Sequence, residues 1–122
     1  MFSRLGISSI WDLIWGSSFW NTKQYYKDWP YLTKEATEFL IQQGIHLLAL
    51  DFPSPDSAYF GDDCSLDSPN HKLLFAQKII LTEYLTNLAS LTSDNIFLMV
   101  SPLKLIGFDG APARVTAYSI DK

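Results

Sequence analysis

Two side chains that could bind a metal ion, His71 and Glu83, lie twelve residues apart in the segment SPNHKLLFAQKIILTEYLTNL. A neutral imidazole and a carboxylate each offer a lone pair to a divalent ion such as zinc. The spacing is too long for one face of a helix, so the two side chains meet only if residues 72–82 form a turn and an adjacent strand. A catalytic metal ion takes at least three protein ligands. Spacing alone therefore favours an ordinary structural role for the pair, and a metal site would need further ligands.

Other residues with chemical potential have simpler interpretations. Asp51 ends the apolar run IHLLAL, and an acid at the carboxyl end of a buried strand is a common functional position in α/β folds. An Asx turn before the next proline explains Asp51 equally well. We expect His46 to be a strand histidine and Cys64 a loop or core thiol rather than a ligand. Ser54 stands between two prolines without a nearby His, which argues against a nucleophile.

Composition narrows the class of protein. The length of 122 residues predicts one domain, and a hydrophobic fraction of 48% is enough for a packed core. The 13 acidic and 9 basic residues show no basic cluster, so we expect no nucleic-acid partner. No segment reaches the roughly 18 uncharged apolar residues of a membrane span. A single cysteine rules out an intrachain disulfide and favours a cytoplasmic location.

The N-terminal segment, residues 1–30, is rich in aromatic side chains and contains all four tryptophans. A small surface cannot expose that many large rings, so Trp11, Trp15 and Trp20 should pack on this domain or on a partner. The residues from Ile10 to Ile14 are compatible with one or two helical turns.

The remaining chain shows an alternation of helices and strands. Thr33 as N-cap and Gly44 as the residue after the C-cap predict a helix over 33–43. The apolar run 45–51 predicts a strand buried on both faces, and 52–70 reads as a long polar loop. Further elements are expected as follows: a helical turn at 71–76, a strand at 79–81, one or two helical turns within 83–91, a strand over 96–105 bent near Pro102, a turn at 107–110 and a return strand over 114–120. This order predicts an α/β domain, with a mixed sheet and flanking helices.

Four sequence blocks follow one another along the chain: YYKDWPYLTKEATEFL, GIHLLALDFPSPD, NHKLLFAQKIILTEYLTNLASL and FLMVSPLKLIGFDGAPARVTAYSI. From about Tyr25 to the C-terminus they resemble the C-terminal half of the cyclase family of metal-dependent hydrolases, which includes bacterial kynurenine formamidase and isatin hydrolase. Each block alone is a weak signal, whereas four in this order are specific. Residues 1–24 match the family pattern less well.

The resemblance implies part of a swivelling β/β/α domain and a binuclear metal centre, usually of zinc and sometimes of manganese. Its second-half ligands correspond to His71 and Glu83. In the family, the other ligands and a catalytic His come from an upstream H-G-T-H-x-D-x-P-x-H motif, which this sequence does not contain. Family members form dimers or larger assemblies, and aromatic loops of a neighbouring subunit often line the pocket. Trp20 could serve as such a substrate wall, beside Asp51, although core packing is the favoured interpretation for the tryptophans.

The function implied by the resemblance is hydrolysis of a C–N bond in a small amide, as in the arylformamidase step of tryptophan catabolism. Because the upstream motif is missing, we expect a truncated or partial member that binds zinc weakly by itself. We expect it to associate with a complementary chain or with copies of itself. The alternative is a non-catalytic oligomer or small-molecule-binding protein derived from that family. The sequence does not identify the substrate.

Overall fold

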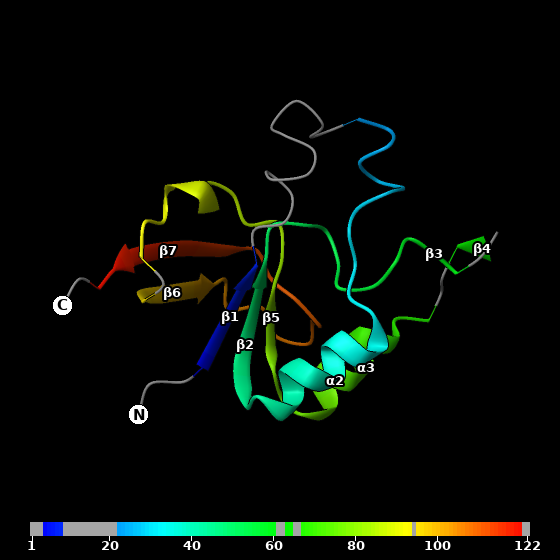
Figure 1. The fold of residues 1–122 in the computed structure, drawn as a ribbon, viewed down its shortest axis with the longest axis horizontal. Coiled ribbons are helices and arrows are strands. Elements are labelled where there is room, and N and C mark those ends of the chain that lie inside the picture. The colour runs from blue at the N-terminus through cyan, green and yellow to red at the C-terminus, as the bar shows by residue number, and fades with distance from the viewer. Residues whose placement is uncertain (1–3, 9–21, 61–62, 65–66, 94, 121–122) are drawn as a thin grey trace. The chain divides into compact units, whose positions relative to one another are not determined.

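The computed structural model describes residues 4–8, 22–60, 63–64, 67–93 and 95–120. The chain divides into two compact units, Met1–Thr86 and Asn87–Lys122. The first holds a three-stranded parallel sheet and two helices, and the second an antiparallel hairpin (Figure 1). The predicted α/β class is confirmed, with its parallel and antiparallel strands in separate sheets. The assignment of all 122 residues to one domain stays a prediction.

The sheet of the first unit has β2 (Ile45–Leu50) at its centre, between β1 (Arg4–Ser8) and β5 (Ile80–Thr82). All three strands run in the same direction. Most of β2 is buried, as its continuous apolar run predicted, while His46 is exposed. The short strand β1 was not expected from the sequence. Because the strands are parallel, their carboxyl ends meet at one edge of the sheet.

Two helices connect these strands and contact each other: α2 (Lys34–Gln42) precedes β2, and α3 (Pro69–Ala76) precedes β5. Right-handed crossovers taken in the same direction across a sheet place both helices on one face. The contacts of α2 with β2 and of α3 with β5 agree with that arrangement (Figure 1). The two helices and the sheet therefore form a two-layer α/β unit.

Local sequence signals set the ends of α2. The hydroxyl of Thr33 accepts a hydrogen bond of 3.2 Å from the backbone N–H of Ala36, as expected of an N-cap. Gly44 has a φ of +70° and donates its N–H to the carbonyl of Ile41. This left-handed conformation is easily adopted by glycine, so the predicted helix end is confirmed.

The C-terminus of α3 is a Schellman motif built without glycine. Ile79 donates its N–H to the carbonyl of Leu74, and Lys78 donates to that of Phe75. Lys78 is in the left-handed region, with a φ of 57°. Ile79 and Leu74 also belong to the same buried apolar cluster. This motif reverses the direction of the chain, which then continues as β5.

The core of the first unit lies between the sheet and the helices. Seven residues form its buried cluster: Tyr25, Ile45, Leu48, Leu50, Phe52, Leu74 and Ile79. Trp29 is partly buried against this cluster. Trp11, Trp15 and Trp20 lie outside the described residues, and so does the expected helical segment from Ile10 to Ile14.

Several expected elements differ in extent from those in the structure. The expected loop 52–70 includes two short paired strands, β3 (Tyr59–Phe60) and β4 (Asp63–Cys64). The helical turns predicted within 83–91 reduce to one 3₁₀ turn, η1 (Leu88–Ser90). That prediction was wrong for residues 83–86, which form no helical turn; Leu85 instead donates its N–H to the carbonyl of Leu50 at the end of β2.

The second unit contains the predicted hairpin. Strands β6 (Ile96–Pro102) and β7 (Ala113–Ser119) pair along their full length, from Ile96 opposite Ser119 to Pro102 opposite Ala113. Within the described part of the chain, no helix has the length and apolar character needed to cross a bilayer.

The two left-handed positions after the helices give a matched test of the fold. Changing Lys78→Gly should raise the free energy of unfolding by about 0.5–1 kcal/mol, because glycine relieves the left-handed strain. Changing Gly44→Ala should lower it by about 1 kcal/mol, although a methyl group there meets no neighbouring atom. Urea unfolding measures both values. A lower free energy of unfolding for Lys78→Gly, together with a higher one for Gly44→Ala, would contradict the assigned helix ends.

Candidate functional site

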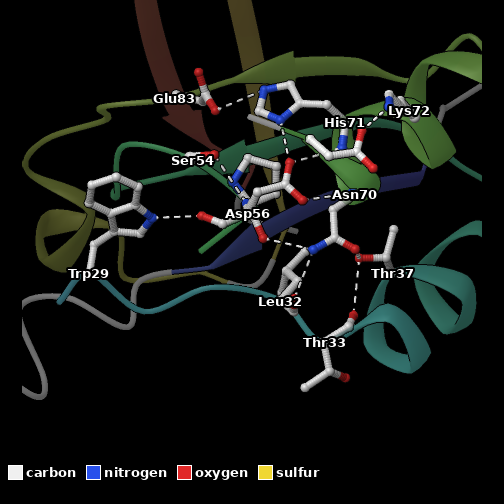
Figure 2. Close-up of polar contacts among 12 residues, drawn as sticks. Trp29, Leu32, Thr33, Thr37, Ser54, Asp56, Asn70, His71, Lys72 and Glu83 are labelled. Carbon is white, nitrogen blue, oxygen red and sulfur yellow. Dashed lines mark hydrogen bonds and ion pairs between the residues drawn. The ribbon is translucent and has the colours of Figure 1, made fainter. Parts of the chain in front are cut away.

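The site is built around Asp56, in the loop that follows β2. The backbone N–H of Asp56 donates to the hydroxyl of Ser54 at 3.1 Å, and its carbonyl accepts from the indole Nε1 of Trp29 at 2.8 Å. The residue is 4% exposed. The loop is thus fixed from both sides, and it directs the Asp56 carboxylate towards the start of α3 (Figure 2).

The Asp56 carboxylate caps α3 from a distance of fourteen residues in the chain. Oδ1 accepts the N–H of Asn70 at 2.7 Å, and Oδ2 accepts the N–H of His71 at 3.1 Å. The local N-cap residue, Ser68, makes no side-chain hydrogen bond of this kind. The first N–H groups of a helix have no partner within the helix, and the positive end of its dipole favours an anion there. A buried carboxylate is therefore stable at this position.

The same carboxylate orients the imidazole of His71. Nδ1 of His71 lies 2.6 Å from Oδ2 of Asp56 and donates its proton to it. The ring of Phe75, one helical turn further on, meets the imidazole edge-on at a centroid distance of 5.5 Å. These contacts hold the ring so that Nε2 points away from Asp56, towards Glu83 (Figure 2).

Glu83 directly follows β5 and approaches His71 from the sheet. Its Oε1 lies 3.5 Å from Nε2 of His71. This oxygen is inaccessible to solvent and has no hydrogen-bond partner among the described residues. The next residue, Tyr84, has a φ of 57° and donates its N–H to Phe52 at 3.3 Å. Glu83 lies at the carboxyl edge of the sheet because β5 ends at Thr82.

Electrostatics at this site favour a positive charge between the two side chains. Glu83 first, and Asp56 second, raise the pKa of His71 above its ordinary value, against the lowering effect of burial. When His71 is neutral and protonated on Nδ1, the Nε2 lone pair faces the lone pairs of Oε1. Two lone pairs 3.5 Å apart repel each other unless a proton or another cation lies between them.

The pair also fits a metal ion. Zinc–nitrogen and zinc–oxygen bonds of roughly 2.0–2.2 Å at a tetrahedral angle separate two ligand atoms by about 3.4 Å. The separation of Nε2 and Oε1 is 3.5 Å. The contact of Nδ1 with Asp56 is the carboxylate–histidine arrangement that usually supports a metal-binding imidazole. Across the described ranges, no group of three or more His, Cys, Asp or Glu side chains is placed to hold an ion.

The structure places the other sequence candidates as follows. Asp51 directly follows β2, and Glu83 directly follows β5 at the same edge of the sheet. Burial raises the pKa of Tyr25 to about 12, with smaller contributions from neighbours that include Asp51. The hydroxyl of Ser54 accepts a hydrogen bond from the backbone N–H of Asp56. Trp20, the second substrate-binding candidate, lies outside the described residues.

Sequence reasoning brought His71 and Glu83 forward but missed the residues that connect them to the fold. Asp56 was visible as the last residue of the block GIHLLALDFPSPD. Its role depends on contacts with Asn70 and His71, which lie 14 and 15 residues away. A local sequence pattern does not predict contacts between residues so far apart in the chain.

The raised pKa of His71 predicts a pH-dependent stability in metal-free protein. Protonated His71 stabilises the fold fully below its ordinary pKa of about 6.5, and this contribution disappears as the pH rises through the higher folded-state pKa. The difference in free energy of unfolding between wild type and His71→Gln should therefore shrink from pH 6 to pH 9 in the presence of a chelator. His46→Gln, at an exposed position of β2, is the control. A difference that stays constant over this range would contradict the assignment.

Comparison with known proteins adds a family similarity to this geometry. Residues 4–57 match the family model described as "Putative cyclase". The matched segment is less than half of the chain and contains β1, α2, β2 and Asp56, but not His71 or Glu83. No curated protein matches the chain. Residues 4–57 of this protein are thus similar to the cyclase family.

Proposed function

We propose that this chain carries half of the metal centre of a metal-dependent amide hydrolase of the cyclase family, similar to an arylformamidase. The observation that carries the proposal is the approach of His71 Nε2 to the buried Glu83 Oε1 at 3.5 Å. The family match over residues 4–57 supports the assignment to the cyclase family, and that segment includes neither His71 nor Glu83.

In this proposal His71 and Glu83 hold the ion, and Asp56 keeps the His71 ring in the tautomer that leaves Nε2 free to bind it. The ion is zinc or manganese. When bound, it supplies Lewis acidity towards an amide carbonyl and makes water more acidic. Asp51, which follows β2 at the same edge of the sheet, and Trp20 are the proposed contacts for a small amide substrate.

Two protein ligands do not complete a catalytic centre. We propose that a complementary chain or a second copy of this chain supplies the remaining ligands. The expected setting is the cytoplasm, where the single Cys64 would stay reduced.

The same two-ligand count favours a second candidate function. A non-catalytic, small-molecule-binding or oligomeric protein would keep the fold and the polar pair without hydrolysing a substrate. In that case the proton shared by His71 and Glu83 is enough to satisfy both groups.

Metal affinity separates these alternatives at the level of the site. The protein should bind zinc at neutral pH. His71→Ala or Glu83→Gln should weaken zinc binding at least tenfold, which is the smallest loss usual when a residue that only supports a metal ligand is changed. His46→Ala should change the affinity less than about twofold, because His46 is exposed on β2. Competition with a chromophoric chelator measures each constant. Equal losses for His46→Ala and His71→Ala would contradict the assigned site.

Activity tests the hydrolase itself. Zinc- or manganese-loaded protein, alone and co-expressed with a candidate complementary chain, should hydrolyse a formylated arylamine, and a chelator should abolish the reaction. Glu83→Gln should lower kcat/KM about 100-fold, because it removes a charged ligand. Tight zinc binding at His71 without hydrolysis in either preparation would favour the non-catalytic alternative.

A further inference from the structure

The side chain of Asn70 is enclosed in a fully satisfied hydrogen-bond network next to the candidate metal centre. The residue is 4% exposed. Its Nδ2 group donates to the carbonyl of Leu32 at 2.8 Å and to that of Pro55 at 3.0 Å. Its Oδ1 accepts from the hydroxyl of Thr37 at 2.8 Å. All three polar positions of the amide are therefore used (Figure 2).

This network leaves one orientation for the amide. Two backbone carbonyls face Nδ2, and both require a donor. Rotating the amide by half a turn would set Oδ1 against these two carbonyls, neither of which can donate, so both hydrogen bonds would be lost. Thr37 is 0% exposed, so neither it nor Asn70 can exchange its partner for bulk water.

The network joins three segments: the start of α2, the loop before Asp56, and α3. Leu32 precedes α2, Thr37 lies within α2, and Pro55 lies in the loop directly before Asp56. Asn70 belongs to α3, and its own N–H binds Asp56 Oδ1 at 2.7 Å. The next residue along α3 is His71. Asn70 thus fixes the distance between the loop that carries Asp56 and the helix that carries His71.

We propose that Asn70, held in place by Thr37, is a positioning residue of the candidate metal centre, setting the Asp56 carboxylate against α3 so that His71 Nε2 faces Glu83. One consequence of this inference, weaker metal binding when the network is broken, rests on the proposed function. Its geometric part, the attachment of Asp56 to the first turn of α3, is independent of any metal ion.

A simple structural role makes a different prediction. If Asn70 only stabilises the fold, its loss lowers protection from unfolding everywhere and leaves the metal site unchanged in folded molecules. If Asn70 positions the site, its loss acts first on the two N–H groups that Asp56 accepts, those of Asn70 and His71. The two roles therefore differ in where the damage appears.

The test compares Asn70→Ala, Thr37→Val and Thr37→Ser in full-length protein. Thr37→Val keeps the shape of the side chain and replaces the hydroxyl, which faces both Asn70 Oδ1 and the Thr33 carbonyl, by a methyl group. This mild change guards against a variant that fails to fold. Thr37→Ser retains the hydroxyl and is the conservative control. Zinc affinity is measured by chelator competition, and amide hydrogen exchange of metal-free protein is followed by NMR, with Leu48 in β2 as the reference amide.

Asn70→Ala should weaken zinc binding about tenfold, near the lower end for residues that support a metal ligand, and Thr37→Val should weaken it by less. Thr37→Ser should bind zinc as wild type does. In both damaging variants, exchange at position 70 and at His71 should accelerate at least tenfold more than exchange at Leu48.

Unchanged zinc affinity together with equal acceleration at all three amides would overturn the proposal and leave the metal site standing. If wild-type protein binds no zinc, the proposed function fails, and the exchange pattern alone decides the role of Asn70. Selective acceleration at position 70 and His71 then supports positioning, and uniform acceleration overturns it.

Discussion

The buried carboxylate of Asp56 is the interaction on which the first unit and its candidate site both depend. It accepts the first N–H groups of α3 and the Nδ1 proton of His71. One negative charge thus starts the helix and orients the imidazole that the helix carries. Because the loop around Asp56 is itself fixed by Ser54 and Trp29, the position of His71 follows from the position of β2.

The parallel sheet supplies the other half of the arrangement. β2 leads to the loop that carries Asp56, and β5, its neighbour in the sheet, leads directly to Glu83. The Schellman motif at Lys78 turns the chain from α3 into β5, so that His71 and Glu83 approach each other across a short connection. The resulting contact between Nε2 and Oε1 requires a proton or a metal ion between two lone pairs, which links the fold to its proposed chemistry.

Sequence signals that act within a few residues predicted structure well. Thr33 and Gly44 mark the two ends of α2 as expected, and the apolar run before Asp51 forms the central strand. From the sequence, His71 and Glu83 were expected to meet only if residues 72–82 formed a turn and an adjacent strand. The contacts of Asn70 with Leu32 and Thr37 span 38 and 33 residues, and nothing in the local pattern encodes them. Such pairings are set by how α2 and α3 pack together.

The most direct measurement of the central claim is anomalous diffraction at the zinc absorption edge from crystals of the protein soaked in zinc. We expect an anomalous peak between His71 and Glu83, within about 2.0–2.2 Å of both Nε2 and Oε1, while Nδ1 of His71 stays hydrogen-bonded to Asp56. An anomalous peak at another position, with His71 Nε2 and Glu83 Oε1 still in direct contact, would contradict the proposed metal site.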